Sequence, residues 1–382
     1  MSGDAKRLYA DREKRVQAAI DLKSPDKVPV YCHEDGYAWA YSGVSLIDYM
    51  TDNDRMMASL KKFHSDFQTD LTGFLPVLMD PLTLAFLQPC PIKLPGKDLP
   101  SDSVHQLVEA ETMCLEDYQY AQENGYISML LKLLPEIRPS IPDVREKFLQ
   151  KTKTNSELGL SNIKQLQKLG KPLWFSGYVE SPISLLVMLR TYAKFCLDLY
   201  RNFNIVAPTV ETFSKELAEL AVQDCKLFRI KRAIIGLHNE SASFFSLKQF
   251  EELALPEIKT MINILIQEKI TPILHCDGNW NLNLPYLTEL PKRKCVIELD
   301  DSTDIFKAKE ILGDRICISG GPMELLLSFG TPKKVKKYCK KLIDVVGEGG
   351  GFLLKGEPPP TAKTENVRAM IEAAKNYGVY KD

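Results

Sequence analysis

The sequence has 382 residues, of which 45% are hydrophobic and 26% are charged, so it can bury a large core and is not globally disordered. Its 49 basic and 50 acidic residues give a net charge of -1, which argues against nucleic-acid binding because that needs a basic surface. No apolar run reaches the ~18 residues of a membrane span, the polar N-terminus lacks a secretory signal, and the nine cysteines include no Cys-x-x-Cys. These features predict a reduced, cytoplasmic protein without a membrane anchor.

The first part of the chain is predicted to form a helix and two strands with polar ends. Residues 1–27 have the periodicity of a charged amphipathic helix, and a short strand centred on Val28 follows. Polar residues, Cys32-His33-Glu34-Asp35, stand at the end of that strand, before an aromatic-rich loop and a helix over 45–62. A second strand is predicted over 70–79, ending at Asp80.

The next part is less regular and predicts an insertion around 82–170. Residues 82–100 are punctuated by prolines, whereas 103–124 and 144–170 both have helical periodicity. A strand over 171–178 then ends in polar and aromatic residues, and helices are predicted over 183–202 and 210–228.

From residue 233 onward, an apolar strand, a polar strand end and a helix repeat regularly, as in a parallel sheet wrapped by helices. Eight predicted strands favour a (β/α)8 TIM barrel over an open sheet, formed by residues 28–382 as one domain with residues 1–27 as an N-terminal helical extension. The strand centres are Val28, Phe74, Leu173, Ile234, Ile273, Ile297, Ile316 and Leu353. Neither a Gly-x-Gly-x-x-Gly nor a Gly-x-x-x-x-Gly-Lys motif is present, so no dinucleotide or P-loop site is indicated.

Candidate metal ligands stand at the ends of the later strands, which converge on one face of a barrel. In Thr271-Pro-Ile-Leu-His-Cys-Asp-Gly-Asn-Trp280, two ligand-type side chains are two residues apart and therefore share one face of the strand. Imidazole, carboxylate and thiolate groups can together hold Zn²⁺ and leave one position open. The predicted ligands are His275, Asp277, Glu298, Cys317 and Glu357. The same groups could serve a metal-free acid–base site, and a buried cysteine is more often a core residue.

Aromatic residues near the strand ends are candidates for the wall of a substrate pocket, although ordinary packing would also explain each of them. The predicted substrate-binding residues are Tyr37, Trp39, Phe175, Tyr178 and Phe244, with Tyr41 and Phe245 beside them. Asp80 and His238 are candidate catalytic residues that could donate or accept a proton.

Five groups of residues carry a resemblance to a known superfamily. They are Lys27-Val-Pro-Val; Trp174-Phe-Ser-Gly-Tyr with Leu189-Arg-Thr and Asp198-Leu-Tyr; Leu274-His-Cys-Asp-Gly-Asn; Gly321 through Gly330-Thr-Pro; and Gly350-Gly-Phe-Leu-Leu-Lys-Gly with Glu365-Asn-Val-Arg-Ala-Met. Through them the chain resembles the uroporphyrinogen decarboxylase-like superfamily over nearly its whole length. The resemblance implies the same barrel fold.

This superfamily contains porphyrinogen decarboxylases and zinc-dependent, corrinoid-linked methyltransferases. The decarboxylases carry Arg-Gln-Ala-Gly-Arg-Tyr, which gathers substrate carboxylates, whereas this chain has the acidic Tyr31-Cys-His-Glu-Asp-Gly-Tyr37. Such a loop would repel an octacarboxylate, which argues against decarboxylation in the heme pathway. The methyltransferases usually bind zinc through His-x-Cys-Gly and a cysteine on the last strand, but here Asp277 and Glu357 follow His275 in place of those cysteines.

Oxygen and nitrogen ligands fit the polarisation of an ether or phenol oxygen better than the activation of a thiol. The chain is therefore similar to the methyltransferase I enzymes of anaerobic O-demethylase systems. The resemblance implies that Zn²⁺ acts as a Lewis acid on a methoxylated aromatic compound, whose methyl group passes to the Co(I) corrinoid of a partner protein. The alternatives are a methyltransferase for thiols or other donors, a metal-free lyase, and a non-catalytic barrel that binds a tetrapyrrole or a corrinoid protein. A homodimer is one possible assembly.

Overall fold

The structure is a computed structural model that describes residues 1–101 and 103–380. At its centre lies a curled, entirely parallel sheet of seven strands in the order β1-β9-β8-β7-β6-β5-β4. Its strands are β1 (Val30–Cys32), β4 (Gly177–Glu180), β5 (Arg232–Leu237), β6 (Thr271–Cys276), β7 (Val296–Leu299), β8 (Cys317–Gly320) and β9 (Phe352–Gly356). The chain is therefore an α/β protein, as the alternating pattern predicts.

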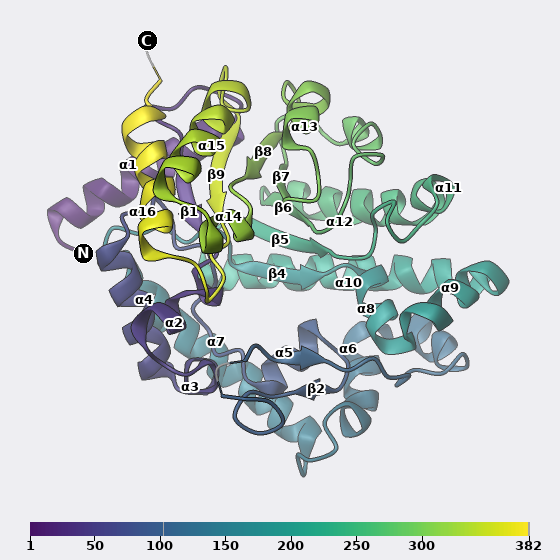
Figure 1. The fold of residues 1–382 in the computed structure, drawn as a ribbon. Helices are drawn as coiled ribbons and strands as arrows, with labels where there is room; N and C mark the ends of the chain where they lie inside the picture. The colour runs from purple at the N-terminus through teal and green to yellow at the C-terminus, as the bar shows by residue number, and fades with distance from the viewer. Residues whose placement is uncertain (102, 381–382) are drawn as a thin grey trace.

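Helices cover the outside of the sheet; α10, α12 and α15, for example, pack against β4, β6 and β9 (Figure 1). The α-helices are α1 (Gly3–Ile20), α2 (Ala38–Ser42), α3 (Leu46–Thr51), α4 (Asn53–Asp66), α5 (Pro81–Leu87), α6 (Asp117–Ile137), α7 (Val144–Gln167), α8 (Pro182–Arg190), α9 (Tyr192–Arg201), α10 (Phe203–Phe228), α11 (Leu247–Gln249), α12 (Leu255–Gln267), α13 (Ile305–Leu312), α14 (Glu324–Phe329), α15 (Pro332–Val345) and α16 (Thr364–Glu372). Short 3-10 turns, η1 (Glu34–Gly36) and η3 (Tyr286–Glu289), and π-helical turns, η2 (Phe250–Ala254) and η4 (Ala373–Tyr377), complete the helical elements. Within residues 1–101 and 103–380, no helix has both the length and the apolar character needed to cross a bilayer.

Residues 70–79, predicted to be a regular second strand, form only a single parallel bridge between Thr72 and Leu173. Backbone hydrogen bonds nevertheless link this segment to β1 on one side and to the residues that precede β4 on the other. The N–H of Asp70 donates to the carbonyl of Val30 at 2.7 Å, and the N–H of Thr72 donates to the carbonyl of Pro172, just before β4, at 2.8 Å. The prediction of a regular strand was wrong because the segment contains a glycine and a proline, which weaken a strand and remove a ladder hydrogen bond.

The predicted helix over 103–124 was also wrong in its first half. Strand β3 (Gln106–Leu107) pairs antiparallel with β2 (Ile92–Lys93), and helix α6 begins only at Asp117. Long-range strand pairing overrides the local periodicity there. Figure 1 shows β2, α5, α6 and α7 gathered on one side of the sheet, next to β4.

The side chains inside the curled sheet form two layers of different character. The lower layer is a buried apolar cluster to which α1 contributes Val16, Ala19 and Ile20. The other members of the cluster are Tyr31, Leu71, Trp174, Phe175, Ile234, Ile273, Val296, Cys317 and Leu353. Side chains two residues apart in a strand point to the same face, so the next inward layer is two residues further along each strand. That upper layer is polar, and it includes His33, His275, Glu298, Ser319 and Lys355.

Candidate functional site

Glu298 of β7 is the centre of the polar layer. It is completely buried, and its Oε1 accepts hydrogen bonds from the hydroxyl of Tyr31 and, at 2.6 Å, from the indole N–H of Trp174. The Tyr31 hydroxyl also bonds to Ser319 at 2.7 Å, so a network from three other parts of the chain fixes the orientation of the carboxylate. A carboxylate held in this way is oriented before any ligand arrives.

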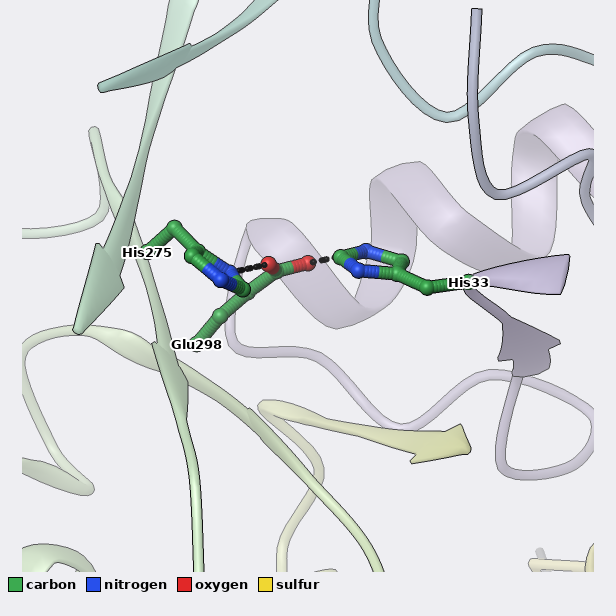
Figure 2. Close-up of side chains that lie close together, drawn as sticks. All are labelled: His33, His275 and Glu298. Carbon is green, nitrogen blue, oxygen red and sulfur yellow. Dashed lines mark hydrogen bonds and ion pairs between the residues drawn. The ribbon is translucent and has the colours of Figure 1, made fainter. Parts of the chain in front are cut away.

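Two imidazole rings face this carboxylate from opposite sides (Figure 2). His275 Nδ1 lies 2.8 Å from Glu298 Oε2, and His33 Nε2 lies 3.6 Å from Glu298 Oε1. The two rings are nearly parallel, with their centroids 5.6 Å apart. Strand register explains why His275 and Glu298 meet, because the two residues are directly opposite each other in the β6–β7 ladder.

His33, His275 and Glu298 could together hold a metal ion, since each offers one ligand atom and these atoms all lie within 4.8 Å of one another. His33 Nε2 is buried and has no hydrogen-bond partner in the described part of the chain, as expected for a donor atom reserved for a ligand. Two histidines and one glutamate form a known catalytic zinc set, which leaves a fourth position for water or substrate. The residues of this site therefore fit zinc.

The electrostatics of the site also favour a bound cation. Burial alone would lower the pKa of His33, but the carboxylates of Glu298 and Glu357 outweigh it and raise that pKa to about 10. Burial opposes ionisation of Glu298 as well, yet His33 and His275 hold the pKa of its carboxyl well below the usual range. The field that favours an imidazolium here would also favour a divalent cation, which would displace the proton from the ring.

A second histidine site adjoins the first. His238 lies between two carboxylates, with its Nε2 2.7 Å from Glu180 Oε2 and its Nδ1 2.6 Å from Asp277 Oδ2. Although burial opposes it, the charge of Glu180 and the hydrogen bond to Asp277 raise the pKa of His238 well above its ordinary value. Gly236 allows this arrangement, because a Cβ at that position would lie 2.1 Å from Glu180 Oε2. The two carboxylates therefore favour the protonated form of His238, which directly follows the carboxyl end of β5.

A cavity of about 570 Å³ opens beside the two histidine sites. Its lining includes His33, His275, Glu180 and Glu357 together with a largely apolar wall. That wall contains Trp39, Leu46, Tyr49, Met50, Phe74, Val77, Met79, Leu84, Leu87 and Tyr178. Among the described residues, no arginine or lysine lines this cavity. We call it the mouth cavity.

The structure brings four of the five predicted metal ligands to this region and places one elsewhere. His275 and Glu298 contact each other directly, Asp277 Oδ1 lies 3.4 Å from His275 Nε2, and Glu357 Oε1 lies 3.2 Å from His33 Nδ1. Cys317 is in the apolar layer below, opposite Val296 in the ladder rather than opposite Glu298. The sequence interpretation therefore placed the end of this strand two residues too early, and the residue that β8 brings to the polar layer is Ser319.

The predicted aromatic residues divide between different environments. Trp39 and Tyr178 line the mouth cavity, whereas Phe175 lines a neighbouring one. Tyr37 is buried, stacks on Tyr41 and bonds through its hydroxyl to Thr364. Two further aromatic residues pack elsewhere. Phe244, in an exposed loop, packs against Tyr192 at the start of α9, and Phe245 packs against Phe195.

The two predicted proton-transfer residues also separate. His238 is at the site, but the Asp80 carboxylate accepts hydrogen bonds from the N–H groups of Leu82 and Thr83 and pairs with Lys151 at 3.1 Å. It therefore caps the N-terminus of α5, a structural task that occupies both of its oxygens.

Sequence reasoning missed His33, Tyr31, Trp174 and Lys355 as site residues. His33 carried a usable signal, because it stands in the polar end of the first strand as His275 does in its own. Lys355 is buried and donates to Glu357 at 2.9 Å, and its charge, with that of His33, outweighs burial and lowers the pKa of the Glu357 carboxyl. No local signal marks Tyr31 or Trp174, since both reach Glu298 across the interior of the sheet.

Comparison with known proteins gives four findings. The family model described as Uroporphyrinogen decarboxylase (URO-D) matches residues 132–377. The chain is 25% identical over 322 residues to the "Uroporphyrinogen decarboxylase" of Chlorobium phaeovibrioides, which covers 80% of this chain and 87% of that protein. It is 30% identical over 229 residues to the "Methylcobamide:CoM methyltransferase MtbA" of Methanosarcina acetivorans, which covers 55% of this chain and 60% of that protein. The fold is similar to that of a "methyltransferase from Methanosarcina mazei", with a TM-score of 0.70, 16% identity, and coverage of 96% of this chain and 98% of that one.

Proposed function

The chain belongs to the uroporphyrinogen decarboxylase family, and we propose that it is a zinc-dependent methyltransferase. The proteins similar to it include both decarboxylases and a methyltransferase. Its methyl donor would be a methoxylated aromatic compound and its acceptor the Co(I) corrinoid of a partner protein. The proposal places this chemistry at the mouth of a (β/α)8 barrel, residues 28–382, in which the irregular segment 70–79 takes the place of the missing strand between β1 and β4.

The observation that carries the proposal is the convergence of His33, His275 and Glu298 beside a cavity with an apolar, aromatic wall. Zinc bound by this group would act as a Lewis acid toward an ether oxygen. The buried indole N–H of Trp39, a residue of that wall, has no acceptor among the described residues. A substrate oxygen would satisfy it, as expected for a polar contact that orients a small aromatic ligand.

The charge of the mouth cavity argues against decarboxylation in this chain, although the relatives that align over most of it are named decarboxylases. Asp35, Glu180, Glu324 and Glu357 line the cavity, and no described arginine or lysine does. A porphyrinogen with eight carboxylates would therefore meet like charges in this cavity, where they would repel it. A neutral methoxylated ring would meet no such penalty.

The chain's own residues have distinct tasks in the proposed reaction. Tyr31 and Trp174 hold Glu298 in place, and Glu357 holds His33 through Nδ1. When the C–O bond breaks, its electron pair stays on the aromatic oxygen and the methyl group leaves toward Co(I). His238, protonated between Glu180 and Asp277, would then give a proton to the phenolate oxygen.

Metal analysis of the purified protein, with His33→Ala and His275→Ala beside it, tests the proposal first. We expect about one zinc per chain in the parent and little in either variant. The parent should also demethylate guaiacol (2-methoxyphenol) in the presence of cob(I)alamin, which absorbance of the methylated corrinoid would report. Cys317→Ala is the matched control, because that side chain is fully buried but lies in the apolar layer.

A parent that binds no zinc after zinc is supplied would refute the metal mechanism. Carbon dioxide release from a porphyrinogen, without methyl transfer from any methoxylated ring, would support the lyase instead.

A further inference from the structure

A second cavity, of about 380 Å³, lies beside the mouth cavity, and we call it the side cavity. Its outer residues Leu149, Thr152 and Gln223, on α7 and α10, are exposed, so it opens to solvent on the flank of the molecule. Its inner wall is shared with the mouth cavity through Phe74, Val77, Met79, Leu87 and Tyr178. Phe74 stands between the two, with its ring centroid 6.2 Å from that of His33 and 5.4 Å from that of Phe175.

Two polar side chains of this apolar lining, Asn155 and Asp224, each have an oxygen that receives no hydrogen bond from the described residues. The Asn155 side chain is 6% exposed, and its Nδ2 donates to the Leu78 carbonyl at 3.0 Å and to Thr83 Oγ1 at 2.6 Å. These bonds identify the amide nitrogen, so the other atom is the acceptor Oδ1, which receives no hydrogen bond from any described residue. This oxygen has almost no accessible surface, so it gives the wall a polar character but does not face the space of the cavity.

Asp224 is the other polar group. It is partly buried in the side cavity, and burial without a compensating cation raises the pKa of its carboxyl to about 7. Among the described residues, no lysine, arginine or histidine lines this cavity. An anionic ligand would therefore meet no opposite charge and would face a carboxyl group that ionises near neutrality.

We propose that the side cavity is a binding site for a neutral aromatic compound that bears a hydroxyl group, such as a phenol. The hydroxyl hydrogen bonds to the Asp224 carboxyl, which is partly exposed in the cavity, and the ring packs against aromatic walls. Those walls are Phe74, Phe86, Phe148, Phe175, Tyr178 and Phe228.

Size and ring chemistry agree with this ligand class. An apolar cavity of ~150 Å³ in another protein binds benzene, so about 380 Å³ has room for one substituted ring. Aromatic rings prefer edge-to-face or offset contacts with one another, which Phe74 already makes with Phe175 at an interplanar angle of 87°. An aliphatic ligand would fill the space but would not gain these contacts.

The ligand class deepens the proposed function, because a phenol is the product of O-demethylation and methoxyphenols are candidate donors. The binding itself rests only on the side cavity and does not require metal or methyl transfer. The two proposals can therefore fail separately.

Binding of 4-fluorophenol to the whole protein, followed by fluorine NMR, is the test. We expect saturable binding that is at least ~3-fold tighter than that of 4-fluoroanisole, which lacks the donor hydrogen. 4-Fluorobenzoate, an anion, should show no saturable binding. Thr152→Trp would fill the outer part of the cavity and should weaken 4-fluorophenol binding at least ~10-fold.

Thr154→Trp is the matched control, since both threonines are exposed on α7 and each hydroxyl bonds back to a carbonyl four residues earlier. Binding that is retained in Thr154→Trp and in Glu298→Gln, but lost in Thr152→Trp, supports the side cavity. Equal binding in the two tryptophan variants, equal affinity for phenol and anisole, or no saturable binding in the parent would overturn the proposal.

Discussion

The two halves of the curled sheet differ in regularity and in what they contribute. From β5 to β9 and on to β1 the strands pair in unbroken parallel register, and this half supplies His33, His275 and Glu298. The half between β1 and β4 has only the Thr72–Leu173 bridge and an irregular segment, and it supplies Phe74, Val77 and Met79 to both cavities. Regular strands fix charged groups to within a fraction of an ångström, as metal chemistry requires. Irregular segments instead shape the space in which a ligand sits.

The largest effect is expected for Glu298→Gln, in the regular half of the sheet. Glutamine keeps the shape but loses the negative charge that faces both imidazoles, so we expect zinc affinity to fall at least ~100-fold and methyl transfer to fall with it. Zinc titration monitored with a chelating dye would measure the change. Ser319→Ala removes a polar side chain of the same layer that reaches Glu298 only through Tyr31, and the direct bonds from Tyr31 and Trp174 remain, so this variant should retain zinc. Equal zinc loss in both variants would show that the layer acts only as a general polar environment.

Cys317→Ser tests whether the boundary between the two layers is as sharp as the register indicates. The thiol is buried among apolar side chains, and burial raises its pKa well above the usual value, so it is a neutral core group. A serine hydroxyl in that place lacks a partner and should reduce the free energy of unfolding by about 2 kcal/mol. Urea denaturation would measure this, and zinc content should not change. Loss of zinc in Cys317→Ser would place this residue in the ligand set after all.

The same contrast explains how much could be predicted from the sequence. In the regular half, the apolar runs, polar ends and following helices correctly predicted β5 to β9, and spacing by two placed His275 and Asp277 on one side of the strand. The strand end at Cys317 was misplaced by one layer, because register between neighbouring strands cannot be read from either strand alone.

In the irregular half, local patterns were a poor guide. The apolar residues over 70–79 have the composition of a strand but line two cavities, and residues 103–116 pair or lie in loops rather than forming a helix. Contacts such as Tyr31 with Glu298 join positions 267 residues apart. They depend on how the sheet curls, which no short window of sequence contains.

Asp224→Asn tests the side cavity, which the irregular segment helps to line, through the pH dependence of stability. A carboxyl group in the unfolded chain has a pKa of ~3.9, whereas burial raises that of Asp224 to about 7 in the fold. Between these values the folded state binds more protons than the unfolded state, so the free energy of unfolding decreases as pH rises. Asparagine does not titrate, and the variant should match the parent near pH 4.5 and exceed it by on the order of 2 kcal/mol at pH 8. Urea denaturation at both pH values would measure this, and a stability gap that does not change with pH would contradict a buried, unpaired Asp224.

The smallest effect is expected for a tryptophan substitution. Two tryptophans are compared because their indole N–H groups have different roles. Trp174 donates to Glu298, whereas the Trp39 N–H is buried in the wall of the mouth cavity without an acceptor in the described part of the chain. Trp39→Phe keeps an aromatic ring but loses that donor, so KM for guaiacol should rise about fivefold, corresponding to ~1 kcal/mol of binding, while kcat and zinc content stay unchanged. Trp174→Phe should do the reverse, because it loosens the carboxylate and not the substrate: zinc affinity and kcat fall, and KM changes little. If both variants changed KM alone, Glu298 would belong to the substrate pocket, and the separation of a charged centre from a ligand-shaping wall would fail.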